Sequence, residues 1–171
     1  AMMTAERTPF ADESPERVRV GVAEFAVANG DTRLTTSGLG SCVGVALADP
    51  TAGVAGLAHV MLPDTPDDDR GKPAKSVEQG VEVLLTELEA AGADLGRVEA
   101  KLAGGSKMFD FSGVSEGVGE RNVERIHAAL ADRDISVVAE DVGGDYGRSV
   151  ELTPETWTLQ VSSTHQGVEN L

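Results

Sequence analysis

Short, unbroken apolar runs alternate in this chain with two longer segments of helical apolar spacing, and this alternation constrains the fold most. The runs 43–48 and 54–61 are short and end at Asp-Pro or Leu-Pro turns, so they are predicted as strands rather than helices. The segments 76–91 and 119–130 carry their apolar residues on one face, as amphipathic helices do. Helices and strands are therefore mixed along the chain, which indicates an α/β or α+β fold.

The remaining elements follow from alternation and turn residues. Further strands are predicted at 18–22, 32–36, 98–103, 135–140, 149–152 and 156–161. Ser76 is expected to cap the first helix and Gly92 to follow its last turn. His127 falls on the apolar face of the second helix, so it is predicted to pack in the core.

The polar ends of the chain bound a single predicted domain. Residues 1–16 are expected to form an N-terminal tail, 17–162 the folded domain and 163–171 a C-terminal tail. A length of 171 residues suits one domain with a real core.

The charge balance excludes some classes of partner. With 29 acidic and 14 basic residues the net charge is −15, which repels nucleic acid phosphates. The chain has no apolar stretch of roughly 18 residues to span a membrane and no apolar run at its N-terminus, so we expect a cytoplasmic protein without membrane insertion. The acidity fits an ordinary soluble protein or a halophilic one, and we favour the halophilic reading because molar salt screens self-repulsion.

Cys42 is the only cysteine, which excludes an internal disulfide or a four-cysteine zinc site. A lone cysteine is most often an inert core residue. Here Gly38, Gly40 and Gly44 surround it, and such glycines let backbone N–H groups crowd around the sulfur. Those donors can hold a thiolate and later an oxyanion, so Cys42 is a candidate nucleophile, with Gly40 and Ser41 as oxyanion or site-shaping positions.

His59 lies in the apolar run that follows, and two interpretations stay open. Alone it would be a hydrogen-bonded core histidine, whereas beside a glycine-flanked cysteine it is a candidate base. Thr36, Ser37 and Ser41 lie near Cys42; such hydroxyls usually satisfy turns, but one of them can orient the imidazole.

The other polar candidates are weaker. His165 is expected to be solvated, and one cysteine with three scattered histidines offers no metal-ligand spacing, so no metal or cofactor is expected. The stretch 104–107 suggests a phosphate loop but lacks the spacing of one. Arg148 is a candidate contact for a substrate carboxylate.

Five motifs together resemble the CheD family, the chemoreceptor glutamine deamidases of chemotaxis. The resemblance covers about residues 18–161, and the cysteine and histidine motifs are its most specific part. The motifs are Thr36-x-Gly38-Leu39-Gly40-Ser41-Cys42-Val43, Ala58-His59-Val60-Met61-Leu62-Pro63, Ala103-Gly104-Gly105-Ser106-x-Met108-Phe109, Gly119-x-Arg121-Asn122-Val123 and Glu140-Asp141-x-Gly143-Gly144-x-x-x-Arg148-Ser149-Val150.

The resemblance implies roles and partners. Cys42 matches the family's nucleophile, His59 its catalytic base and Thr36 the threonine that orients the base. It implies an α/β sandwich of mixed sheets flanked by helices, similar to the catalytic domain of the cytotoxic necrotizing factor toxins. It also implies chemoreceptors as substrates, a CheC-type phosphatase as partner, and hydrolysis of glutamyl methyl esters as a related activity; we further expect a monomer. Ser76 departs from the family, where many members carry an aromatic residue.

Two rival functions use the same residues differently. A docking protein that regulates a CheC-type phosphatase would need no catalysis, yet Thr36, Cys42 and His59 are all present. A redox-sensing thiol is the weaker rival, because no second cysteine is available to resolve a sulfenic acid.

Overall fold

The computed structural model describes residues 16–65, 71–107 and 117–171. The predicted N-terminal tail, apart from Glu16, and motif residues Met108 and Phe109 lie outside these ranges. Within them the chain forms ten strands, two α-helices and one 3-10 helix, η1 (Leu95–Arg97). None of the described helices is long and apolar enough to cross a membrane.

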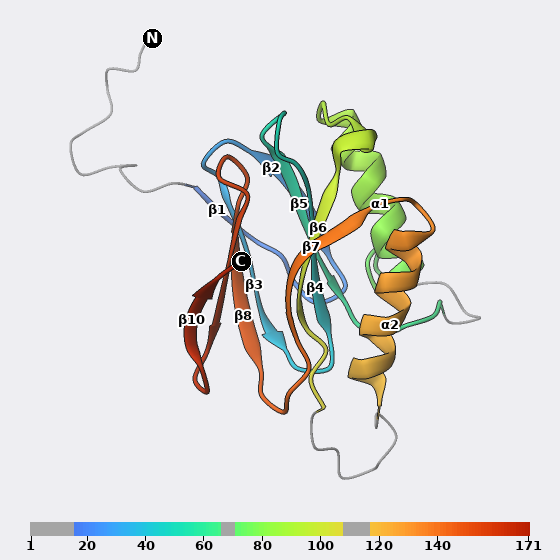
Figure 1. Ribbon diagram of the computed structural model, residues 1–171, viewed down its shortest axis with the longest axis vertical. Coiled ribbons are helices and arrows are strands. Elements are labelled where there is room, and N and C mark those ends of the chain that lie inside the picture. Colours follow the sequence, from blue (N-terminus) through green and yellow to red (C-terminus); the bar gives the residue numbers. More distant parts are fainter. Residues whose placement is uncertain (1–15, 66–70, 108–116) are drawn as a thin grey trace, which may run out of the picture.

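Two five-stranded sheets and a helical layer stack face to face (Figure 1). The outer sheet has the order β1-β3-β8-β9-β10 and comprises β1 (Arg17–Arg19), β3 (Arg33–Leu39), β8 (Arg148–Thr153), β9 (Thr158–Ser163) and β10 (Gly167–Asn170). The central sheet has the order β2-β5-β4-β6-β7 and comprises β2 (Phe25–Asn29), β5 (Val54–Val60), β4 (Val43–Asp49), β6 (Glu99–Gly104) and β7 (Ser136–Val142).

Each sheet is mixed. The pairs β1–β3 and β6–β7 are parallel, and the other pairs are antiparallel. Helices α1 (Val77–Ala90) and α2 (Val118–Ala131) cover the face of the central sheet that points away from the outer sheet (Figure 1). The predicted α/β class with mixed sheets and flanking helices is therefore confirmed.

The central strands β4 and β5 are buried along their whole length because both faces of their sheet are covered. Alternate side chains serve two different cores, as the pleat of a strand requires. Val43, Val45 and Leu47 pack under the helices, whereas Ala46 and Ala48 pack between the two sheets. This double burial explains why both runs are apolar without alternation, and the two predicted strands are confirmed.

Helix α1 follows the prediction closely. Its apolar stripe of Val77, Val81, Leu84 and Leu88 is buried against the central sheet. Gly92 follows the last turn with φ +105°, a conformation that suits glycine. Ser76 occupies the N-cap position, but its hydroxyl contacts Gln79 Oε1 and Thr65 Oγ1 rather than a backbone N–H of the helix.

Three local expectations fail, and the first concerns the predicted strand 18–22. β1 ends at Arg19, and the chain then turns so that β2 joins the other sheet. Ala23 has φ 65° in this turn, and Glu24 Oε1 accepts a hydrogen bond from Gly21 N at 3.0 Å. Valine alternation does not reveal a change of sheet, because it continues through the turn at Val22.

The other two concern α2 and the C-terminus. The prediction that His127 packs in the core is wrong: its side chain is 43% exposed, and its Nε2 lies 2.8 Å from Glu140 Oε1. Asn122, Ile126 and Ala129 take the buried face instead. Residues 163–171, expected as a tail, include β10, which extends the outer sheet through pairing with β9.

Candidate active site

The segment around Cys42 is the crossing from the outer sheet to the central sheet. β3 ends at Leu39 in one sheet and β4 begins at Val43 in the other. The register of β3 shifts between Thr36 and Leu39, and Gly38 adopts φ +73° within the shift. The half-buried Cys42 therefore sits where the two sheets meet at one end of β4.

His59 and Cys42 face the same space between the sheets. In the antiparallel ladder His59 lies opposite Gly44, and Cys42 precedes Gly44 by two residues, the spacing that returns a side chain to the same face. Cys42 packs against the apolar cluster between the sheets, as does Leu57, two residues before His59. Gly44 places no side chain between them. The fold thus brings the two predicted residues onto one face at neighbouring positions.

Thr36 reaches His59 from the opposite sheet. Its Oγ1 lies 2.8 Å from His59 Nδ1 and 2.7 Å from the carbonyl oxygen of Val20. A carbonyl only accepts, so the single hydroxyl proton goes to Val20 and Oγ1 accepts from Nδ1–H. This arrangement leaves His59 Nε2 as the basic nitrogen. Nε2 is buried and has no hydrogen-bond partner among the described residues.

Burial favours the neutral forms of both candidate residues. Desolvation raises the pKa of the Cys42 thiol, and the hydrogen bond from its own backbone N–H opposes this rise. Desolvation also lowers the pKa of the fully buried His59 imidazole. The resting pair is therefore a thiol and a neutral imidazole rather than a thiolate and an imidazolium.

The backbone carbonyl groups of the cysteine segment, residues 40–42, accept hydrogen bonds from the turn at 105–106 and from helix α2. Ser106 N donates to Gly40 O at 2.8 Å, and Gly105 N donates to Cys42 O at 2.9 Å. Asn122 Nδ2 donates to the carbonyl between them, Ser41 O, at 2.9 Å. Within the part of the chain that the structure describes, the N–H groups of Ser41 and Cys42 bond to no other residue. Three consecutive carbonyls are thus anchored while two N–H groups stay available near the sulfur.

The sequence analysis assigned no role to Asn122. Its signal was a polar residue on the buried side of an amphipathic helix, three positions after Gly119. The predicted apolar face of this helix comprises Val123, Ile126, His127 and Leu130. Ile126 and Leu130 are indeed buried, but His127 is not, so the buried face was placed too far toward His127 and away from Asn122. An asparagine at a position of the helix that faces the core indicates a buried hydrogen-bonding role, and this was the signal available in the sequence.

Arg148 does not act as the predicted substrate contact. Its side chain is only 1% exposed and donates to Asp141 Oδ1 at 3.2 Å, Tyr146 Oη at 3.1 Å and Ser106 Oγ at 2.9 Å. The guanidinium also lies over the Tyr146 ring, 4.3 Å from its centroid. A group so enclosed braces the turn behind the cysteine segment and cannot reach a substrate carboxylate.

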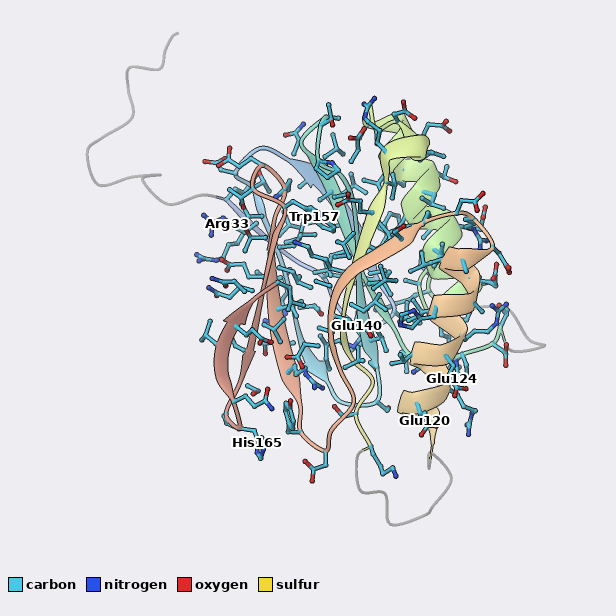
Figure 2. The ribbon with its side chains drawn as sticks, in the orientation of Figure 1. Arg33, Glu120, Glu124, Glu140, Trp157 and His165 are labelled. Atoms are coloured by element: carbon cyan, nitrogen blue, oxygen red, sulfur yellow. The ribbon has the colours of Figure 1, made fainter. Side chains whose placement is uncertain are left out.

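His165 is exposed, as expected, but not simply solvated. Its ring stacks on the ring of Tyr146, with centroids 4.7 Å apart and an interplanar angle of 15° (Figure 2 labels His165). It therefore extends the Arg148–Tyr146 stack from the tip of the outer sheet.

The backbone N–H groups of the suggested phosphate loop at 104–107 are partly used in hydrogen bonds within the protein. The N–H groups of Gly105 and Ser106 already donate to the cysteine segment. A cavity of about 570 Å³ borders this turn, and its charged lining residues are Lys107 and three acidic residues, Glu120, Glu124 and Asp145 (Figure 2 labels the two α2 glutamates). The three carboxylates outnumber the single ammonium group, so the cavity disfavours a phosphate. Among the described residues no group of histidine, cysteine, aspartate and glutamate side chains is arranged to hold a metal ion.

Comparison with known proteins supplies the family. The family model described as "CheD chemotactic sensory transduction" matches residues 61–163. A probable chemoreceptor glutamine deamidase CheD of Haloarcula marismortui is 45% identical over 152 residues, covering 89% of this chain and 88% of the relative. The chemoreceptor glutamine deamidase CheD of Thermotoga maritima is 43% identical over 148 residues, covering 86% and 92%.

Among solved structures, a Neisseria meningitidis protein of family DUF152 is similar with a TM-score of 0.42 and 11% identity, covering 76% of this chain and 63% of that one. The sequence relatives and the family model are decisive: this chain belongs to the CheD family.

Proposed function

We propose that this protein is a chemoreceptor glutamine deamidase that converts receptor glutamine side chains to glutamate, with Cys42 as nucleophile and His59 as base. The observation that carries the proposal is the Thr36–His59 hydrogen bond of 2.8 Å. It engages Nδ1 and leaves Nε2, which has no partner among the residues that the structure describes, to act as the base. The relatives with names of this activity span nearly the whole folded chain.

In the first half-reaction His59 Nε2 takes the Cys42 thiol proton as the sulfur attacks the side-chain amide carbon of glutamine. A C–S bond forms and the carbonyl electron pair moves to oxygen, giving a tetrahedral oxyanion. When the intermediate collapses, the C–N bond breaks and the imidazolium proton passes to the leaving nitrogen. Ammonia departs and a thioester remains on Cys42.

In the second half-reaction His59 takes a proton from water, and the resulting hydroxide attacks the thioester carbon. The C–S bond breaks, the thiol is restored by the proton from His59, and glutamate is released. A glutamyl methyl ester passes through the same thioester and releases methanol in place of ammonia. Thr36 keeps Nδ1 bonded throughout, so Nε2 exchanges every proton.

The backbone N–H groups of Ser41 and Cys42 are the donors we assign to the oxyanion, with Gly40 allowing the close approach. Preorganised amides of this kind are each worth about 10²–10³ in rate. The anchored carbonyls of Gly40 and Ser41 support this role, because they share peptide units with the N–H groups of Ser41 and Cys42, and a held peptide cannot turn its N–H away.

The proposed setting follows the family. Chemoreceptors are the substrates and a CheC-type phosphatase is a regulatory partner, while the protein itself works as a cytoplasmic monomer without nucleic acid. The net charge of −15 supports a halophilic setting. We also keep the likeness to the cytotoxic necrotizing factor catalytic domain as a proposal, which superposition on such a domain would test.

Mass spectrometry tests the activity directly. A receptor cytoplasmic fragment is incubated at molar salt with the wild type or with Cys42→Ala, and peptides are scored for the mass gain of amide-to-acid conversion. We expect conversion at defined glutamines with the wild type and a loss on the order of 10⁴-fold or more with Cys42→Ala. Equal conversion by a folded Cys42→Ala would reject Cys42 as nucleophile, and no conversion by the wild type with a CheC-type partner present would favour a docking role.

A further inference from the structure

Asn122 connects the segment that carries the candidate nucleophile, just before β4, to the chain just after β5, the strand of the candidate base. Its side-chain amide donates to Ser41 O at 2.9 Å and to Met61 O at 3.0 Å. Ser41 directly precedes Cys42, and Met61 follows His59 by two residues. The last β4–β5 pair is Val43 with Val60, so Asn122 ties the chains together just beyond the end of the ladder.

The chemistry of the contacts fixes the orientation of the amide. Both partners are backbone carbonyls, which only accept, so the nitrogen of Asn122 must face them and both of its N–H groups are used. The oxygen, Oδ1, is buried and has no partner among the described residues. A leucine or valine would fill this space without an unpaired oxygen, so burial of an asparagine here is explained by its two donors.

The helix is close enough for this contact because of Gly119. A Cβ at Gly119 would lie 2.3 Å from Ser106 O, so the first turn of α2 packs directly on the backbone of the 104–106 turn. Asn122 follows three residues later, on the same side of the helix. The start of α2 is therefore built against the back of the cysteine segment.

We propose that Asn122 is a positioning residue that fixes the Ser41–Cys42 peptide and thereby aims the Cys42 N–H at its own sulfur and at the reaction's oxyanion. The peptide unit is planar, so holding its C=O on one side holds its N–H on the other. A hydrogen bond to the C=O also polarises the unit and strengthens the N–H as a donor. By binding Met61 O as well, Asn122 keeps this peptide in register with the strand of His59.

This inference rests on the proposed function for its catalytic part, but its effect on the thiol does not require deamidation. The variant Asn122→Ala removes both donors, and Asn122→Ser leaves a shorter group that cannot span both carbonyls. Glu124→Gln, a change at an exposed position of the same helix that removes a charge and leaves the cysteine segment untouched, is the control. Thermal unfolding of each variant shows which ones are folded at the assay temperature.

Two readouts separate positioning from mere support of the fold. In receptor deamidation we expect kcat to fall about tenfold to a hundredfold with KM changed less than threefold, since a donor is misaimed rather than removed. In alkylation of Cys42 by iodoacetamide we expect the pH at half-maximal rate to rise, because the thiolate loses its backbone donor. Glu124→Gln should leave both readouts as in the wild type.

The proposal is overturned if folded Asn122→Ala or Asn122→Ser keeps the wild-type alkylation profile, whatever happens to kcat. Failure of the wild type to deamidate would reject the proposed function alone, and the alkylation shift would still decide the role of Asn122. If neither variant folds, the amide proton of Cys42 in the wild type is followed by NMR through the thiol titration. A large downfield shift on ionisation is expected, and no shift would overturn the proposal.

Discussion

The two ends of strand β4 are built on opposite principles. Its last residue, Asp49, is fully buried and accepts hydrogen bonds from Thr51 N, Ala52 N, Asp94 N and the guanidinium of Arg97 at 2.8–3.2 Å. Just before its first residue lies Cys42, and opposite Gly44 in the ladder lies His59, whose buried Nε2 has no hydrogen-bond partner in the described part of the chain. At one end both carboxylate oxygens of Asp49 are hydrogen-bonded, whereas at the other end the His59 Nε2 is left to bind a further group.

The difference is that between stability and reactivity. A buried polar group with all its partners lowers the free energy of the native state, whereas one without a partner costs free energy until something binds it. The Arg97 side chain accordingly lowers the pKa of Asp49 to about 2, while His59 and Cys42 are shifted mainly by desolvation toward their neutral forms. Unmet hydrogen-bonding capacity in a well-packed fold points to the reacting end.

Replacing His59 should break this contrast most strongly. His59→Gln keeps a polar side chain of similar volume but has no basic nitrogen, so we expect kcat for deamidation to fall about 10²–10⁴-fold. His127→Gln is the matched control, because His127 lies half-exposed on α2, and it should retain full activity. Equal losses of kcat in the two variants would mean that the loss does not come from removal of the proposed base.

The pH dependence of kcat/KM sharpens the same point. In the proposed mechanism activity requires neutral His59, so it should fall as pH drops through the His59 pKa, and burial places that pKa below its ordinary value of 6.5. The acidic limb is therefore expected below pH 6.5, and the limb should disappear from the residual activity of His59→Gln. An acidic limb above pH 6.5 would contradict a lowered pKa of His59.

Removing the Thr36 hydroxyl should have a smaller effect. Thr36→Val keeps the shape but leaves His59 Nδ1–H without its acceptor, so the ring can turn or change tautomer. Misplacement of a catalytic group by about 1 Å can cost on the order of 10²-fold in rate, and we expect kcat to fall by that order or less. Thr35→Val, the neighbouring residue on the other face of β3, serves as control. Unchanged kcat in Thr36→Val would leave the hydroxyl with a packing role only.

A substitution at the opposite end of β4 should lower the stability of the protein and leave its activity almost unchanged. Asp49→Asn loses the charge-assisted bonds to Arg97, so we expect the free energy of unfolding to fall by about 2 kcal/mol in urea titrations, with kcat within about twofold of the wild type. A large loss of activity at unchanged stability would show that the two ends are coupled.

The same carboxylate predicts an acid dependence of stability. The folded pKa of about 2 lies below the ordinary 3.8, so the contribution of Asp49 is present above pH 3.8 and is lost as pH falls toward 2. Urea titrations across this range should show a smaller acid loss in Asp49→Asn than in the wild type. Parallel losses in both proteins would assign the acid dependence to other carboxylates.

Local patterns predicted most of the elements. The runs of β4 and β5, the stripe of α1 and the turn at Gly92 appear where the sequence places them, because each depends on neighbours within a few residues. Strand β2, the position of the buried face of α2 and strand β10 were not predicted. Each is decided by a partner far along the chain: β2 by pairing with β5, the α2 phase by the turn at 104–106, and β10 by pairing with β9.

By itself, the sequence determined the family and the candidate site residues with their spacing along the chain, since these are properties of the residues in order. Only the tertiary structure decided that Thr36 reaches His59 across two sheets, that Arg148 is enclosed behind the site, and that Asn122 holds the peptide before Cys42. The reason is physical: hydrogen bonds act over about 3 Å in space, and residues 23, 42 and 81 positions apart meet at that distance only when the sheets and helix pack together.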